Sequence, residues 1–211
     1  MAAVATAPAG PRLWLVRHAQ PLVAPGTCYG ALDVPADAQA TRHAARRLAD
    51  ALPAGAKVWH STLQRCEHLA QALQALRPDL ASKPDARLRE MDFGGWEGLA
   101  WDAVDRSAID AWTAAFPHHA PGGGEPLQAM LARVAAALQH TARLPAGAAS
   151  GAPERERDVV WITHAGVIRC VTWLLAQGPG VLPRSQDWPV AAPAWGAWQQ
   201  VDLVAARRLS A

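Results

Sequence analysis

Four short segments of this 211-residue chain place a charged or titratable side chain directly after an apolar stretch. Arg17 and His18 follow "LWLV", Arg65 comes just after "KVWHS", Glu90 ends "ARLRE", and His164 follows "VVWIT". Such groups need a reason to lie at the end of a buried strand, because burying them without a partner costs free energy. These residues are therefore the first candidates for a functional site.

The residue types in this set suit phosphoryl transfer. Two guanidinium groups are planar forks of fixed charge that match the oxygens of a phosphoryl group. A neutral imidazole can attack phosphorus and form a covalent intermediate, while a second imidazole donates to the equatorial oxygens. A carboxyl group can protonate the leaving oxygen and then deprotonate water. Positioning and charge stabilisation carry most of this reaction, and the set supplies both without a metal ion.

Each residue taken singly also fits an ordinary structural position. Arg17 is compatible with a salt bridge at a strand end, and either histidine with a hydrogen-bonded place in the core. Arg65 is compatible with a solvated charge on a helix, and Glu90 with a pair to Arg87 or Arg89. The five residues taken together favour a functional site, because every one of them lies at or just beyond a predicted strand end.

Apolar periodicity predicts the elements that position these residues. Strands are predicted over 13–16, 57–61, 86–90, 159–163 and 197–204. Helices are predicted over 41–52, 62–76, 98–115, 125–140 and 166–176. This alternation indicates an α/β sandwich with a largely parallel sheet. Ligands in such folds bind beyond the carboxyl ends of the strands, which is where the candidate residues lie.

Length and composition predict one folded domain over residues 12–211, preceded by a flexible tail over residues 1–11. Hydrophobic residues make up 51% of the chain and charged residues 18%, which suits a substantial core. The segment 144–158, "LPAGAASGAPERERD", is predicted to be a flexible surface connection.

Charge and hydropathy narrow the choice of partners. The net charge is only +2 and no basic run exceeds two residues, which argues against nucleic acid. No apolar run approaches the roughly 20 residues of a membrane span, and the N-terminus lacks the features of a signal peptide. We therefore expect a cytoplasmic protein that acts on a small phosphorylated metabolite, with no membrane partner. A homodimer is left open, and the tryptophans near the C-terminus either cover a sheet edge or form a subunit contact, namely Trp188, Trp195 and Trp198.

Metal binding is not expected. Cys28, Cys66 and Cys170 are spaced too widely for a zinc site and are expected to be reduced thiols. The neighbouring His118 and His119 are expected to be ordinary loop histidines.

The four segments resemble those of the histidine phosphatase superfamily, also called phosphoglycerate mutase-like. "LVRHAQP" is similar to its Arg-His-Gly core, "HSTLQRCEHLA" to its second arginine segment, "LREMDFGGWEGL" to its acid-bearing segment and "THAGVIR" to its second histidine segment. The matches run in the family's order from residue 13 to about 170. The resemblance implies a three-layer α/β/α sandwich with a mostly parallel sheet. It also implies a phosphomonoesterase of the histidine acid phosphatase type, without metal or cofactor.

The resemblance implies a role for each candidate residue. His18 would be the phosphorylated nucleophile and Glu90 the proton donor. Arg17, Arg65 and His164 would bind the phosphoryl group together with His18, and His164 would thereby also serve catalysis.

Three positions depart from the family's usual pattern. Ala19 stands where glycine is usual after the nucleophile, and Gln20 stands where many members have glutamate. Pro126 follows "GGGE" where a serine is common, which removes a hydroxyl group and a backbone donor. None of these changes removes a group that the chemistry needs.

The loop "GTCYGALDVPA" and the segments "LQRCEHLA", "EMDFGGWEGLAWDAV" and "HAGVIR" resemble the alpha-ribazole phosphatase branch. This finer resemblance implies removal of a phosphate late in cobalamin synthesis. Gln20, Cys28, Tyr29 and Gly30 would then wall the substrate pocket.

Tryptophans flank the acid-bearing segment, namely Trp96, Trp101 and Trp112. They either line an apolar mouth for an aromatic leaving group or pack in the core, and the core is the more usual place for a tryptophan.

Two other functions stay open at this point. One is phosphoglycerate mutase-type phosphoryl transfer, and the other is a non-catalytic phosphate-binding protein on the same fold. No long insertion lies between Arg65 and Glu90 or after Trp96 to build a closed mutase site. A binding protein would be expected to have lost at least one member of the set, which is intact here.

Overall fold

A computed structural model describes residues 10–144 and 158–203 of the chain. The tail predicted over residues 1–11 and the connection predicted over 144–158 fall almost wholly outside these ranges, so both stay predictions. The same holds for one domain extending to residue 211.

The described residues form one five-stranded sheet with the strand order β3-β2-β4-β1-β5. The strands are β1 Arg12–Arg17, β2 Lys57–His60, β3 Ser82–Pro84, β4 Val159–Thr163 and β5 Trp198–Asp202. β3, β2, β4 and β1 run parallel to one another, and only β5 runs antiparallel, along the outer edge of β1. All five residues of β4 are buried, as expected for a central strand covered on both faces.

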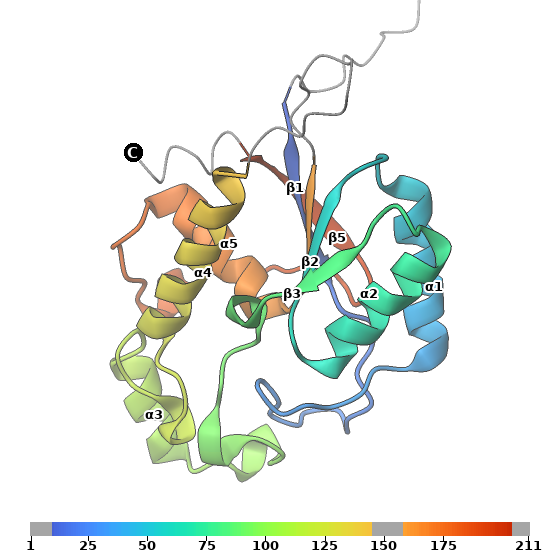
Figure 1. Ribbon diagram of the computed structural model, residues 1–211. Helices are drawn as coiled ribbons and strands as arrows, with labels where there is room; N and C mark the ends of the chain where they lie inside the picture. The colour runs from blue at the N-terminus through green and yellow to red at the C-terminus, as the bar shows by residue number, and fades with distance from the viewer. Residues whose placement is uncertain (1–9, 145–157, 204–211) are drawn as a thin grey trace, which may run out of the picture.

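Helices cover both faces of this sheet (Figure 1). α1 Ala38–Ala51 and α2 Gln64–Leu76 pack on one face, and α4 Leu127–Ala142 and α5 Ala165–Gln177 pack on the other. Successive β1 residues point to opposite faces, so Leu13 and Leu15 join the α4–α5 core while Trp14 and Val16 join the α1–α2 core. The expected three-layer α/β/α sandwich is confirmed.

The strand predicted over 86–90 is wrong. The third strand is β3, farther upstream, and Ala86–Leu88 form a 3₁₀ turn instead. Asp85 begins this turn, because its carboxylate accepts from the backbone N–H of Arg87 and also pairs with the Arg87 guanidinium. The backbone carbonyl of Leu88 accepts from the Thr163 hydroxyl at 2.7 Å, so a side chain replaces a sheet partner there.

The helix predicted over 98–115 forms only in its second half, as α3 Arg106–Ala114. Trp101–Ala103 makes a separate 3₁₀ turn, and Asp105 caps α3 by accepting from the N–H of Ser107 at 2.7 Å. α3 lies away from the sheet, beside the chain that leads into α4 (Figure 1). This arrangement leaves the acid-bearing segment as an irregular arm over the carboxyl ends of the strands.

Parallel pairing brings the candidate segments together. Arg17 lies opposite Thr163 in the β1–β4 pair, so His18 and His164 leave the sheet side by side. The N–H of Ser61, just beyond β2, donates to the carbonyl of Ile162 at 2.9 Å and places the start of α2 next to them. No helix among the described residues is long and apolar enough to cross a membrane.

The α1–α2 layer offers a direct test of the core. Leu69 on α2 is 0% exposed and packs in this core, whereas Leu76 on the same helix is 47% exposed. We expect Leu69→Ala to lower the free energy of unfolding by about 2–5 kcal/mol, because it removes buried methyl groups and leaves a cavity. Leu76→Ala should change it by less than about 1 kcal/mol. Urea denaturation of both variants measures the difference, and equal losses would contradict this packing.

Candidate active site

His18 lies directly beyond β1 and is 2% exposed. Its backbone N–H donates to the carbonyl of Thr163 at 3.0 Å, which continues the β1–β4 ladder by one residue. Its Nδ1 lies 2.7 Å from the backbone carbonyl of Ala19. A carbonyl can only accept, so Nδ1 carries the ring proton and Nε2 keeps a free lone pair. The imidazole is thereby set as a neutral nucleophile.

Burial keeps His18 neutral. The pKa of His18 is lowered to about 3, chiefly by loss of solvent and then by the positive charges of Arg65 and Arg17, against a raising contribution from the Ala19 carbonyl. The pKa of His164 is also held well below its ordinary value, chiefly by burial and then by Arg65. Both rings are thus uncharged at neutral pH, which a nucleophilic imidazole requires.

His164 is brought next to His18, with 5.1 Å between the ring centroids. Its Nδ1 accepts from Nε of Arg65 at 3.3 Å, so its Nε2 carries the proton and donates to the Ser61 hydroxyl at 2.8 Å. Both ring nitrogens are therefore engaged within the protein. In this arrangement His164 orients Arg65, and direct binding of a phosphoryl group by His164 stays a prediction.

Arg65 is 0% exposed and has no carboxylate within salt-bridge distance among the described residues. It donates to the carbonyls of Leu32 and Gly30 at 2.9 and 2.6 Å, and a guanidinium carries more N–H groups than these bonds use. The ring of Tyr29 covers its Cζ at 5.6 Å from the ring centroid. A buried cation held only by neutral partners favours an anionic ligand.

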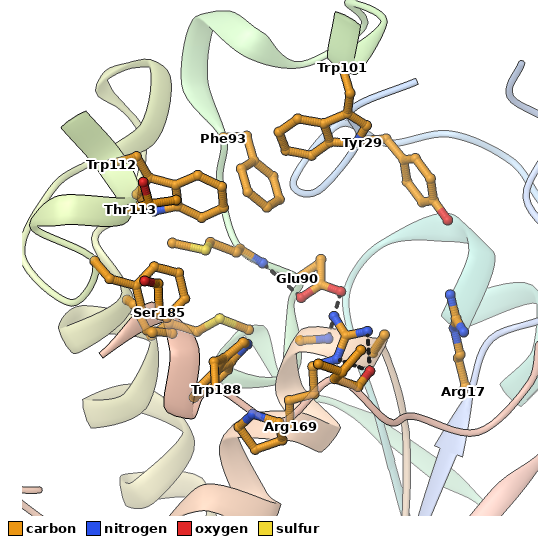
Figure 2. A pocket seen from close by; sticks show the side chains of 18 of the residues that line it. Arg17, Tyr29, Glu90, Phe93, Trp101, Trp112, Thr113, Arg169, Ser185 and Trp188 are labelled. Atoms are coloured by element: carbon orange, nitrogen blue, oxygen red, sulfur yellow. Dashed lines mark hydrogen bonds between the residues drawn. The ribbon is translucent and has the colours of Figure 1, made fainter. Parts of the chain in front are cut away.

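Arg17 ends β1 in the same situation. Its Nη1 donates to the carbonyl of Pro193 at 3.0 Å, its Nε is buried without a hydrogen-bond partner, and its Cζ lies 5.3 Å from the centre of the Trp195 ring. Desolvation lowers the pKa of Arg17, against raising contributions from Tyr29 and Glu90. Figure 2 shows its guanidinium pointing toward the hydroxyl of Tyr29 and the open space beside Glu90.

Glu90 is fixed by two backbone donors. Its Oε2 accepts from the N–H of Gly166 at 2.9 Å and its Oε1 from the N–H of Met91 at 3.1 Å. A Cβ at position 166 would collide with Oε1, so a larger residue there would displace the carboxylate. The carboxyl group therefore sits against the first turn of α5.

Only part of this set opens on a cavity of about 510 Å³, within the range of about 300–1,000 Å³ usual for ligand sites. Arg65 and His164 are both 0% exposed and lie outside its lining. Arg17, His18, Tyr29 and Glu90 line it, together with a residue outside the predicted set, Arg169. The rest of the wall is largely aromatic and apolar (Figure 2).

Not every predicted pocket residue reaches this cavity. Tyr29 lines it, whereas Gly30 lies behind it and contributes its carbonyl to Arg65. Cys28 is fully buried, and burial raises the pKa of its thiol to about 12. Gln20 lines a separate hollow of about 240 Å³ with His43 and Trp195. The structure therefore does not bring Gln20 and Cys28 to the cavity that holds His18.

The departures from the family pattern are accommodated locally. No residue other than glycine has positive φ among the described residues, so Ala19 needs no conformation reserved for glycine. Pro126 is the N-cap residue of α4, where its missing N–H breaks no helical hydrogen bond.

Sequence reasoning missed three charged residues of the site. Arg169, on α5, lines the cavity and donates to the carbonyl of Val190 at 2.9 Å. Arg133, on α4, donates to the carbonyls of Arg87, Arg89 and Glu90 and pairs with Glu125. Glu97 accepts from the N–H groups of Ala31, Leu32 and Phe93. Helical spacing of Arg169 from Ala165, next to His164, is a signal that could have identified the first of these.

No group of three or more His, Cys, Asp or Glu side chains in the described part of the chain is arranged to hold a metal ion. His118 hydrogen-bonds Gln128 at 2.8 Å, in a loop outside the cavity lining.

Comparison with known proteins places this geometry in context. A family profile described as the histidine phosphatase superfamily (branch 1) matches residues 13–192. Phosphoglycerate mutase-like protein 4 of Arabidopsis thaliana is 31% identical over 147 residues, covering 66% of this chain and 60% of that protein. This chain therefore aligns with less than two thirds of that relative's length.

Three solved structures share the fold. The mycobacterial glucosyl-3-phosphoglycerate phosphatase has a TM-score of 0.71 at 27% identity, covering 90% of this chain and 89% of that one. A mycobacterial protein named hydrolase 1 has a TM-score of 0.73 at 26% identity, with coverage of 92% and 89%. The protein TTHB049 from Thermus thermophilus has a TM-score of 0.64 at 29% identity, with coverage of 90% and 93%.

The lowered pKa of His18 predicts a pH effect on stability. The unfolded chain binds a proton near the ordinary value of 6.5, while the folded ring stays neutral down to about 3. The contribution of His18 to the free energy of unfolding is thus complete above about pH 6.5. It falls as the pH falls toward the folded-state pKa of about 3. Between pH 7 and pH 5, His18 should account for a loss of about 2 kcal/mol in the free energy of unfolding.

Urea denaturation of wild type and His18→Gln at both pH values measures this contribution. The loss on acidification should be smaller by about 2 kcal/mol in His18→Gln. His68→Gln, at an exposed position on α2, is the control and should keep the wild-type dependence. An unchanged pH dependence in His18→Gln would show that His18 is not held neutral in the fold.

Proposed function

This chain belongs to the histidine phosphatase superfamily, and we propose that it is a metal-independent phosphomonoester hydrolase that forms a phosphohistidine on His18. One observation carries the proposal. The proton on Nδ1 of His18 is fixed by the Ala19 carbonyl, which frees Nε2 as a nucleophile within 5.1 Å, ring to ring, of the histidine that holds Arg65. Arg65 and Arg17 have no carboxylate within salt-bridge distance among the described residues, so a phosphate dianion supplies the missing negative charge.

The first step transfers the phosphoryl group to the protein. Nε2 of His18 attacks phosphorus, and the bond between phosphorus and the ester oxygen breaks. Glu90, in its protonated form, gives its proton to the departing oxygen, so that the alcohol leaves neutral. Arg17 and Arg169 line the cavity and stabilise the charge on the phosphoryl oxygens, and the buried Arg65 adds its positive charge next to His18. Direct contact between Arg65 and the phosphoryl group stays a prediction.

The second step returns His18 to its starting state. Glu90, now a carboxylate, takes a proton from a water molecule as that water attacks phosphorus. The bond between phosphorus and Nε2 breaks, and inorganic phosphate leaves. The backbone donors of Gly166 and Met91 hold Glu90 in place for both steps.

The physiological substrate is a finer part of the proposal. We retain alpha-ribazole phosphate as the candidate, on the motif resemblance of the loop around Tyr29 and of the acid-bearing segment. A solved relative is a glucosyl-3-phosphoglycerate phosphatase, which makes a phosphorylated sugar acid the competing substrate. Mutase-type transfer remains the alternative reaction. The cytoplasmic location and the homodimer stay predictions.

The first experiment measures release of inorganic phosphate from p-nitrophenyl phosphate with EDTA present. We expect wild type to be active and His18→Ala to lose at least about 100-fold in kcat, since it lacks the nucleophile. His68→Ala, on the exposed side of α2, is the control and should keep wild-type activity. Full inhibition of wild type by EDTA, or an active His18→Ala variant, would contradict metal-free catalysis by His18.

The role of Glu90 predicts a dependence on the leaving group. In Glu90→Gln, kcat/KM for ethyl phosphate should fall by about 100-fold or more, because ethoxide leaves poorly without a proton. The loss for p-nitrophenyl phosphate should be much smaller, since p-nitrophenolate is a stable anion. Equal losses for the two esters would reject Glu90 as the proton donor. Glu67→Gln, on α2 and outside the cavity lining, should change neither value.

A further inference from the structure

Three of the aromatic side chains that line the cavity lie apart from its charged side chains. Figure 2 shows Arg17, Glu90 and Arg169 on one side of the open space and Phe93, Trp101 and Trp112 on the other. The first group accounts for binding and transfer of the phosphoryl group under the proposed function. The second group is not used by that chemistry and remains to be explained.

The aromatic side chains form one connected wall. Phe93 meets Trp101 and Trp112 edge to face, at centroid distances of 5.5 and 6.0 Å, and the two indoles are nearly parallel, at 10°. Trp112 continues to Phe116 at 5.6 Å, and Phe116 to Trp188 at 6.1 Å. Contacts of this kind hold each ring in place. The wall is therefore a preformed surface rather than a set of independent rings.

These rings differ from the tryptophans of the core. Trp161 is 1% exposed and donates its indole N–H to Thr141, and Trp173 is 8% exposed and donates to the carbonyl of Val181. Trp101, in contrast, lines the cavity and is 37% exposed. An exposed aromatic ring in the wall of a cavity leaves apolar surface in contact with water. A ligand that packs against the ring removes that surface from water.

Few polar groups accompany the aromatic wall. Outside the charged side of the cavity, the hydroxyl groups that line it belong to Thr27, Tyr29, Thr113 and Ser185. The indole N–H of Trp112 is buried without a hydrogen-bond partner. A sugar or a carboxylate of the substrate placed there would lose its bound water and regain few hydrogen bonds, which costs free energy. A flat apolar ring would lose little and would gain contact with several fixed aromatic faces and edges.

We propose that the alcohol part of the substrate is an uncharged aromatic group that packs against Phe93, Trp101 and Trp112. This inference rests on the proposed function, because it takes the phosphoryl group of the substrate to lie beside His18. It defines a substrate class, the phosphomonoesters of alcohols that carry an aromatic ring system. It places phosphorylated sugar acids outside that class. The cavity of about 510 Å³ has room for such a group beyond the phosphate.

The test compares non-hydrolysable phosphonates, so that binding is measured without turnover. Isothermal titration calorimetry of wild type should show 1-naphthylmethylphosphonate binding at least about tenfold more tightly than methylphosphonate, through aromatic contact and apolar burial. 3-Phosphonopropionate, which carries a carboxylate in addition to its phosphonate, should bind no more tightly than methylphosphonate. Equal affinity for all three compounds, tighter binding of 3-phosphonopropionate, or no binding of any compound would overturn the proposal.

A matched pair of variants locates the aromatic ligand. Trp101→Ala removes a cavity ring that is already 37% exposed, so the fold should tolerate it. It should weaken binding of the naphthyl compound by about fivefold or more and leave methylphosphonate unchanged. Leu99→Ala, two residues away, 43% exposed and outside the cavity lining, should change neither. Unaltered naphthyl binding in Trp101→Ala would place the ring elsewhere and refute the assignment.

The two proposals can fail separately. A preference for the naphthyl compound in a protein that releases no phosphate from any ester would support the ligand class and reject the hydrolase. Hydrolysis of p-nitrophenyl and ethyl phosphate through His18, with equal phosphonate affinities, would support the hydrolase and reject the ligand class.

Discussion

The parallel pairing of β1 with β4 is the constraint on which the rest of the site depends. It ends in the hydrogen bond from the His18 N–H to the Thr163 carbonyl, at 3.0 Å. That bond fixes where His18 leaves the sheet, and the next carbonyl, that of Ala19, then fixes the ring tautomer. His164 leaves β4 at the same level and reaches Arg65 on α2. A one-residue shift of β1 in this pairing would turn His18 to the opposite face of the sheet and separate it from His164.

A second constraint ties the arginine segment to the acid-bearing segment. The loop from Gly30 to Leu32 is held from two sides, because Arg65 binds its carbonyl groups and Glu97 binds its N–H groups. Glu97 also accepts from the backbone N–H of Phe93, whose ring belongs to the aromatic wall. A Cβ at Gly30 would collide with the Met91 carbonyl, so the loop and the acid segment are in close backbone contact. The loop therefore links Arg65, at the phosphate site, to the segment that carries the aromatic wall.

The sequence was informative where local pattern decides the structure. Unbroken apolar runs identified β1 and β4, and the parallel sheet then predicted that Arg17, His18, Arg65, Glu90 and His164 converge. It failed at residues 86–90, where the Asp85 carboxylate and the Thr163 hydroxyl compete with strand pairing. It also missed Arg133 and Glu97, because their partners are backbone atoms of distant segments, and backbone partners leave no mark in residue types.

The electrostatics of the site follow from the absence, among the described residues, of a carboxylate within salt-bridge distance of Arg65 or Arg17. A carboxylate paired with Arg65 would cancel the positive charge that helps to hold the pKa of His18 down, and would compete with phosphate for the guanidinium. The protein instead satisfies Arg65 with the carbonyls of Gly30 and Leu32, which are neutral acceptors. A phosphate dianion that enters this site meets an undiminished positive charge and a neutral ring. Because the same anion would favour protonation of that ring, fast transfer requires His18 to begin with a strongly lowered pKa, and burial provides it.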